Sequence, residues 1–255
     1  MKQKIVILGT DCQSTRLLYH SLAKEFVIDR VILEQRTSRW KLITRRVQKI
    51  GLVLTVGQVL FQVLLVPFLR IGGRKRARFI LQESGYLDLE IPLGKISHVT
   101  TVNSQDCRNM LAVLLPIIVI VSGTRIVSSE TLRCVEAKFI NIHAGITPQY
   151  RGVHGGYWAL WNGDRQNCGV TVHLVDRGID TGGVLYRTKI HVTGDDNFTT
   201  YPLLQICAGI GLLKLAIADI LAGNDRVECG SYDSKLWHHP TLWGYLWVRF
   251  TKSIK

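Results

Sequence analysis

Three polar residues in the second half of the chain have the types and spacing expected of a catalytic centre. Asn141 and His143 lie two residues apart after the apolar run 138–140. If that run is a β-strand, its period of two places both side chains on one face. Asp180 follows in a glycine-rich turn, where the backbone can approach a ligand closely. An amide, an imidazole and a carboxylate are the groups needed to stabilise a developing oxyanion and to move a proton.

Each of these residues also has an ordinary structural explanation. Asn141 could form a turn, His143 could be a hydrogen-bonded core histidine, and Asp180 could cap a turn. Taken singly, each residue favours the structural explanation. Their combination in one short segment favours catalysis.

Several short segments around these residues resemble the signature of the folate-dependent formyltransferases. Five of them follow one another in the family's order, which is far more specific than a single glycine motif. The family includes glycinamide ribonucleotide formyltransferase, methionyl-tRNA formyltransferase and the sugar N-formyltransferases. The family's usual Leu-Pro pair is Thr147-Pro148 here, which alters loop packing rather than the catalytic residues. The segments are Asn141–His143, Thr147–Gly152, Trp158–Leu160, Gly169–His173 and Gly178–Gly182.

The resemblance implies transfer of a formyl group from N10-formyltetrahydrofolate to a primary amine, without a metal. It implies that Asn141 and His143 donate hydrogen bonds to the negative oxygen of the tetrahedral intermediate. Asp180 would hold His143 or an ordered water and receive the proton that the amine loses. The geometry of the site decides whether Asp180 holds His143 or a water molecule.

The resemblance also assigns residues to the two ligands. The folate would be held mainly by backbone groups, at Gly123, Thr124, Arg125, Ile126, Asp176 and Gly178. The amine acceptor would be contacted by Thr10, Arg151, Gly152 and His154. His173 reads instead as an ordinary strand residue, because it alternates with apolar neighbours.

Composition is that of a globular protein. The chain has 255 residues, 47% of them hydrophobic, enough for one sizeable core with a small appendage. Only four consecutive apolar residues precede Gly9, too few for a secretory signal, so we expect a cytoplasmic protein. The six cysteines lie far apart, and we expect reduced, mostly buried thiols at Cys12, Cys107, Cys134, Cys168, Cys207 and Cys229.

The pattern of apolar runs predicts an α/β domain over residues 1–230, with a doubly wound, mostly parallel, Rossmann-like sheet flanked by helices. A strand at 4–8, a glycine turn, a helix and a strand at 27–33 form an opening βαβ unit. A helix is predicted at 131–135, and a long apolar helix at 203–221 should cover one sheet face.

Residues 36–80 form a predicted basic helical insert. Eleven of the 13 net positive charges lie between Arg36 and Arg78, where no Asp or Glu occurs, which leaves +2 for the rest of the chain. The basicity therefore belongs to one insert, and a nucleic-acid partner is not favoured. Apolar residues keep helical spacing from Trp40 to Leu54, and 50–69 are uncharged. A polar stripe interrupts that uncharged run at Thr55, Gln58 and Gln62.

The insert leaves three alternatives open. A basic amphipathic helix can lie peripherally on an anionic membrane, here the inner face. It can equally pack on its own domain or on a second subunit in a homodimer, and its length alone allows a true span. The tail 231–255 mixes aromatic and basic residues, so it could stack nucleic-acid bases, sit at a lipid interface or close over the insert.

Among acceptors, we expect a nucleotide-linked amino sugar of polysaccharide biosynthesis. The glycine-rich phosphate loop of the purine enzyme is absent from 9–11, where Asp11 would repel an anion. Methionyl-tRNA formylation in relatives uses a further C-terminal domain, for which we expect no room. The alternatives are those two acceptors, hydrolysis of the formylfolate, and a non-catalytic membrane-associated binding protein on the same fold.

Overall fold

The centre of the molecule is a seven-stranded sheet in the order β3-β2-β1-β4-β5-β7-β8. The computed structural model describes residues 3–228 and 233–255. Five strands are mutually parallel: β1 (Ile5–Gly9), β2 (Ile28–Glu34), β3 (Ile96–Val99), β4 (Ile118–Ser122) and β5 (Lys138–His143). β7 (Gly169–Leu174) is antiparallel to β5, and β8 (Val184–Lys189) is antiparallel to β7. The predicted doubly wound, mostly parallel sheet is confirmed.

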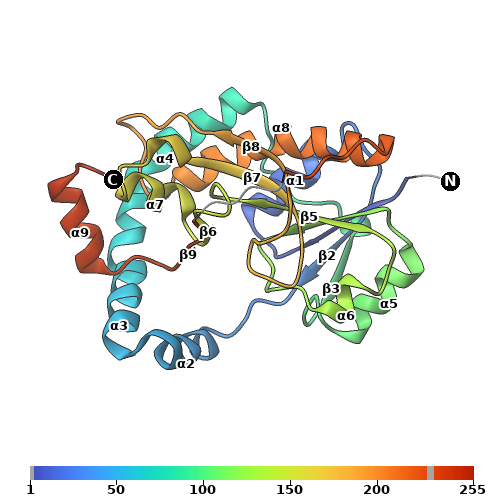
Figure 1. Ribbon diagram of the computed structural model, residues 1–255, viewed down its shortest axis with the longest axis horizontal. Coiled ribbons are helices and arrows are strands. Elements are labelled where there is room, and N and C mark those ends of the chain that lie inside the picture. The colour runs from blue at the N-terminus through green and yellow to red at the C-terminus, as the bar shows by residue number, and fades with distance from the viewer. Residues whose placement is uncertain (1–2, 229–232) are drawn as a thin grey trace.

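Helices cover both faces of the sheet (Figure 1). Alternate residues of β1 point to opposite faces, so Ile5 and Ile7 pack with α1 (Gln13–Leu22) and α8 (Tyr201–Ala222). Val6 and Leu8 pack on the other side with α5 (Gln105–Leu114) and the residues around α6 (Ser129–Leu132). The helix predicted at 131–135 therefore begins and ends earlier, because Ser128 caps it by accepting a hydrogen bond from the Thr131 amide. Two short 3-10 turns lie at Leu93–Lys95 and Arg165–Asn167.

The insert is helical but not continuous. Gly51, with φ +84°, separates α2 (Arg39–Ile50) from α3 (Leu52–Leu60), so the helical spacing predicted through Leu54 is interrupted. α3 continues through a π-helical turn (Phe61–Leu65) into α4 (Val66–Ser84), and together they form a long helix along one side of the molecule (Figure 1). Pro67 follows the π turn, whose wider geometry accommodates a residue that lacks an N–H donor.

The polar stripe of the insert points into the protein. Thr55 and Gln58 are buried, and Gln58 Nε2 donates a hydrogen bond of 2.8 Å to the carbonyl oxygen of His239. Many apolar side chains of 52–71 are exposed instead, Val53 by 72% and Phe68 by 71%. Two helical stretches, Leu52–Ser84 and α8, are long and apolar enough to cross a membrane by length and composition. α8 packs on the sheet in the main core, whereas the first stretch keeps much of its apolar surface exposed.

The C-terminal tail closes over the insert, one of the three arrangements considered for it. β9 (Leu236–Trp237) pairs with β6 (Arg151–Gly152), and α9 (Leu242–Thr251) packs against α3. An aromatic core joins α9 to the π turn and to α7 (Gly155–Trp161), through Phe61, Tyr157, Phe198 and Tyr245. The boundary predicted at 230 falls within 229–232, outside the described residues.

The cysteines within the described ranges are free thiols. Cys107 and Cys168 are buried, whereas Cys12, Cys134 and Cys207 are half-buried, so fewer are buried than predicted. Cys229 lies outside the described residues. Among the residues that the structure describes, no group of three or more His, Cys, Asp or Glu side chains could hold a metal ion.

Candidate active site

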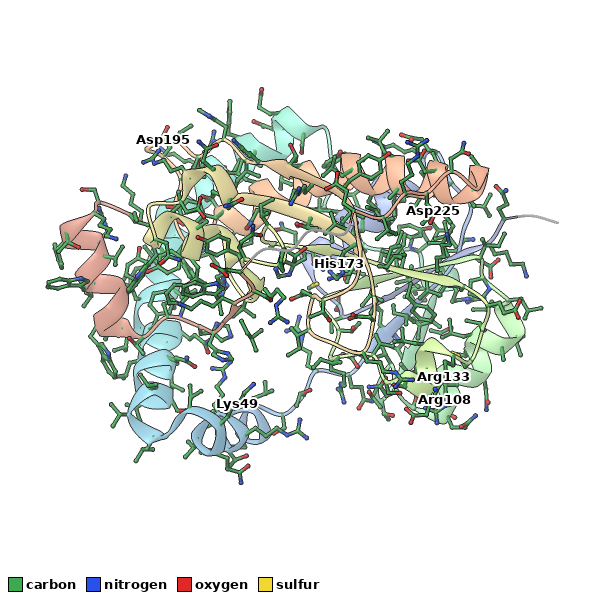
Figure 2. The ribbon with its side chains drawn as sticks, viewed as in Figure 1. Lys49, Arg108, Arg133, His173, Asp195 and Asp225 are labelled. Carbon is green, nitrogen blue, oxygen red and sulfur yellow. The ribbon has the colours of Figure 1, made fainter. Side chains whose placement is uncertain are left out.

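Two adjacent strands deliver the polar side chains of the site. Asn141 and His143 come from β5, and His173 lies opposite Asn141 on β7. His173 Nδ1 donates to the carbonyl oxygen of Leu174 at 2.7 Å, which leaves its Nε2 to accept a hydrogen bond from the Asn141 amide at 3.2 Å. The imidazole of His173 therefore orients the amide of Asn141. Figure 2 shows His173 at the centre of the molecule.

His143 is held at both ring nitrogens. Its Nε2 lies 2.7 Å from the carbonyl oxygen of Tyr150, and because a carbonyl only accepts, this nitrogen carries the proton. Its Nδ1 lies 3.3 Å from Asp180 Oδ2. In the neutral ring this Nδ1 has no proton, so its lone pair faces the carboxylate of Asp180. Neither nitrogen of the neutral ring is therefore free to donate to an oxyanion, which differs from the role that the resemblance implied for His143.

Asp180 is placed by the loop that precedes β8. The residue itself has a left-handed φ of +52°, and its Oδ2 accepts a hydrogen bond of 2.9 Å from the Gly152 amide. Asp176 fixes the start of the loop by accepting hydrogen bonds from the Gly178 amide and the Thr181 hydroxyl. A Cβ at Gly178 would lie 1.8 Å from that hydroxyl oxygen, so only glycine fits this turn. The loop thereby carries Asp180 to the ends of β5 and β7.

The titration of the pair follows from its burial. Desolvation lowers the pKa of His143 below its ordinary value, more than the negative charge of Asp180 raises it. Burial alone would raise the pKa of Asp180, but the net shift is downward, and the hydrogen bond from the Gly152 amide contributes to it. At neutral pH the pair therefore holds a neutral imidazole and a charged carboxylate. His143 Nδ1 and the Asp180 carboxylate are both hydrogen-bond acceptors, so together they form a site that can take up one proton.

A cavity of about 610 Å³ opens above these residues. Its walls include Asn141, His143 and Asp180, so the structure brings the three predicted catalytic residues together. The residues predicted to hold the folate all line it too: Gly123, Thr124, Arg125, Ile126, Asp176 and Gly178. Arg125 fixes this wall, because its Nε lies 2.9 Å from the carboxylate of Glu34 and its amide donates to the same side chain.

Among the predicted acceptor residues, only Gly152 lines the cavity. Thr10 lies behind Gly123, with its Oγ1 at 3.6 Å from where a Cβ of that glycine would be. Arg151 donates to the carbonyl oxygen of Ile179, so it supports the Asp180 loop. His154 is turned away from the cavity, where its Nε2 lies 3.0 Å from His239 Nδ1 and its ring packs on Phe198.

Other residues line the cavity that were not predicted to do so. Arg46 and Lys49 reach it from α2, and Figure 2 shows Lys49 on that helix. The tail adds Leu236, Trp237, His238 and His239. Nothing in the spacing of these residues distinguishes them from a solvated basic face or a closing segment. For His173 a signal did exist, since an imidazole in a run of buried strand residues needs polar partners.

The chain was compared with known proteins. The formyl transferase family matches residues 94–202. A methionyl-tRNA formyltransferase of Clostridium beijerinckii is 32% identical over 155 residues, which cover 60% of this chain and 48% of that protein. The match thus spans about half the length of this relative.

Solved structures show the same fold. A sugar N-formyltransferase from a Shewanella species superposes with a TM-score of 0.58 at 16% identity, covering 92% of this chain and 76% of that one. A glycinamide ribonucleotide transformylase from Symbiobacterium toebii also gives 0.58 at 16% identity, covering 90% and 95%. The five segments that carry the predicted resemblance lie within the matched residues. The resemblance is confirmed: residues 94–202 match the formyl transferase family.

Proposed function

We propose that the chain transfers a formyl group from N10-formyltetrahydrofolate to a primary amine. The observation that carries this proposal is the contact of His143 with Asp180, beside Asn141, on the wall of a cavity large enough for a folate.

The wall opposite the insert suits the folate. Val121, Ile126, Val127 and Val175 give it an apolar surface for a flat ring, and the turn at 123–126 offers backbone groups for the ring's polar edge. When bound, N10-formyltetrahydrofolate supplies the formyl carbon that the amine attacks. The residues present therefore fit this ligand.

The chain's own residues would then stabilise charge and accept a proton. The Asn141 amide has a second N–H beyond the one given to His173, and it can donate to the formyl oxygen as negative charge develops there. A donor of this kind is typically worth about 3 to 4 kcal/mol. The neutral Nδ1 of His143 and the carboxylate of Asp180 form the site that receives the amine's proton. The same site can return that proton to N10 as the bond between N10 and the formyl carbon breaks and tetrahydrofolate leaves.

We further propose that the acceptor is an amino sugar carried on a nucleotide, in polysaccharide biosynthesis. Arg46 and Lys49 place two cations on the cavity wall, and neither has a described carboxylate within 4.0 Å. Burial lowers the pKa of Arg46, so a phosphate would supply the counter-charge that this guanidinium lacks.

The test measures tetrahydrofolate released from N10-formyltetrahydrofolate by the purified 255-residue chain. The acceptors are nucleotide-linked amino sugars, glycinamide ribonucleotide and charged initiator tRNA, with a reaction lacking any amine. We expect turnover with a nucleotide-linked amino sugar, and its loss in Asp180→Asn but not in the exposed carboxylate control Asp195→Asn.

Each other result has a definite meaning. Turnover with either of the other acceptors overturns the sugar proposal and keeps formyl transfer. Formate release without an acceptor identifies a hydrolase. Folate binding that is unchanged in Asp180→Asn and Asn141→Ala, without turnover of any kind, would indicate a binding protein on the same fold.

A further inference from the structure

We infer that the outer side of the α3–α4 helix docks on an anionic lipid bilayer. This insert face is defined by Val53, Val56, Val63, Leu64, Phe68 and Ile71, each at least 44% exposed. The inference goes beyond formyl transfer and stands on separate observations.

The first observation is a helix whose apolar side faces outward. Thr55, Gln58 and Phe61 are buried toward the protein, at helical spacing, and the insert face occupies the opposite side. A stretch of helix from Leu52 to Ile71 is about 30 Å long at 1.5 Å per residue. A soluble surface rarely leaves an apolar strip of this length uncovered.

The second observation is the charge around this strip. Arg45 precedes it on α2, and Arg70, Arg74, Lys75 and Arg78 follow on α4. No acidic residue occurs from Gln35 to Gln82. Cations at both ends of an apolar helix can reach lipid phosphates while the apolar side enters the acyl boundary.

The third observation is that α9, which packs against α3, also exposes aromatic residues beside basic ones. Tyr245 and Val248 are buried against the aromatic core, whereas Trp247 and Phe250 are 67% and 81% exposed. The sequence from Leu236 to Lys255 is again free of acidic residues and contains Arg249, Lys252 and Lys255. Exposed tryptophan beside cations is typical of a membrane–water interface.

Charge decides between a bilayer and a second copy of the chain. A two-fold dimer built on the insert face would bring its cations against identical cations, and the segment supplies no carboxylate to pair with them. An anionic bilayer supplies the opposite charge along the whole strip, with about 1 kcal/mol gained for each basic residue near the surface.

The experiment measures binding of the whole chain to vesicles by flotation. One set of vesicles contains phosphatidylcholine and phosphatidylglycerol, and the other contains phosphatidylcholine alone. Leu64→Ser/Phe68→Ser tests the apolar strip, and Val113→Ser/Leu93→Ser replaces apolar residues elsewhere that are even more exposed. Arg74→Glu/Lys75→Glu tests the charge, and Lys24→Glu/Arg226→Glu makes the same change in net charge outside the insert.

We expect binding only to the anionic vesicles, weakened by salt. Each insert double variant should bind roughly tenfold more weakly or worse, while both controls bind like the unsubstituted chain. Turnover with a soluble acceptor should persist in the insert variants, so failure of docking and failure of formyl transfer are separable.

Three results would overturn the inference. One is a monomeric protein that does not bind anionic vesicles. Another is equal binding to both vesicle types or equal loss in the controls. The third is a dimer in light scattering that dissociates in Leu64→Ser/Phe68→Ser and shows no lipid binding, which would assign the insert face to a second copy.

Discussion

His143 Nδ1 lies 3.3 Å from Asp180 Oδ2, on the side of the ring away from its hydrogen bond to Tyr150. That hydrogen bond fixes the tautomer, so the lone pair of a neutral His143 points at a carboxylate. The arrangement holds one negative charge and lacks a bridging proton. The His143–Asp180 pair can therefore accept a proton, and this property leads to measurable effects on catalysis and on its pH dependence.

Removing the charge of Asp180 should abolish most of the catalysis while leaving folate binding intact. In Asp180→Asn the side chain keeps its shape, but the proton acceptor is lost, so we expect kcat to fall on the order of 10²- to 10⁴-fold. Steady-state kinetics and direct measurement of folate affinity check this. Asp195→Asn, an exposed carboxylate outside the site, should retain the full rate. An unchanged kcat in Asp180→Asn would remove the carboxylate from the mechanism.

The acid limb of the pH–rate profile should lie below the ordinary pKa of histidine. His143 is active as the neutral ring, and burial lowers its pKa, so activity should persist as the pH falls through 6.5. Because the charge of Asp180 raises this pKa, Asp180→Asn should move the titration of His143 to still lower pH. NMR of the labelled imidazole measures the shift without needing turnover. A shift to higher pH would show that the two side chains do not interact as described.

The half-buried pair His154 and His239 should make the fold sensitive to acid. Burial lowers the pKa of His154 to about 3 and that of His239 to about 4, against 6.5 in the unfolded chain. Below pH 6.5 the unfolded state binds more protons, so stability is full above that pH and is lost as the pH falls toward 4. For two protons the slope approaches about 2.7 kcal/mol per pH unit.

Urea denaturation at several pH values tests this prediction. His239→Gln should remove about half of the slope, and His98→Gln serves as the control for loss of an exposed histidine. Equal slopes in all three proteins would assign the acid sensitivity to other groups.

Much of this architecture is predictable from the sequence because it depends on local rules. The β-branched runs at 5–9 and 118–122 form parallel strands, and Gly223 ends α8 in the left-handed conformation that glycine favours. Asn141 and His143 meet Asp180 because strand period and loop glycines constrain them strongly. These are near neighbours in sequence or share a recognisable signature.

What could not be predicted depends on contacts between distant segments. Arg46 lines the cavity only because Gly51 turns α2 away from α3, and a single glycine does not reveal the direction of a turn. His154 looked like a substrate contact because its loop is rich in glycine, but it lies behind His239, a residue far along the chain that lines the cavity in its place. Gln58 points inward because the tail supplies a partner, the carbonyl oxygen of His239, that helical periodicity cannot show.

The ion pair of Arg76 with Asp196 should anchor the insert to the domain. Arg76 Nε and Nη2 lie 2.8 and 3.0 Å from the two carboxylate oxygens, and the Asp196 side chain is fully buried. Arg76→Gln leaves that carboxylate without its cation, so we expect a loss of about 3 kcal/mol in the free energy of unfolding. Arg78→Gln, two residues along and exposed, should cost little. Equal effects of the two substitutions would mean that the pair contributes no specific stability.

Gly57 should allow α9 to pack closely against α3. A Cβ at this position would lie 2.3 Å from the Trp243 ring, so Gly57→Ala must displace the indole and should destabilise the fold by about 1 kcal/mol or more. Gly72→Ala on the same helix meets nothing within 4 Å and should be neutral or stabilising. The double variant Gly57→Ala/Trp243→Ala should lose no more stability than Trp243→Ala alone. Thermal unfolding distinguishes these outcomes.

The confinement of charge to the insert also affects how the molecule moves before any contact forms. With eleven basic residues between Arg36 and Arg78 and a net charge of only +2 on the rest, the protein has a permanent electric dipole moment. A negatively charged surface therefore exerts a torque on the tumbling molecule at distances within the Debye length. The insert, and with it the α2 wall of the cavity, turns to face that surface first. Orientation thus precedes docking, and raising the ionic strength should randomise it.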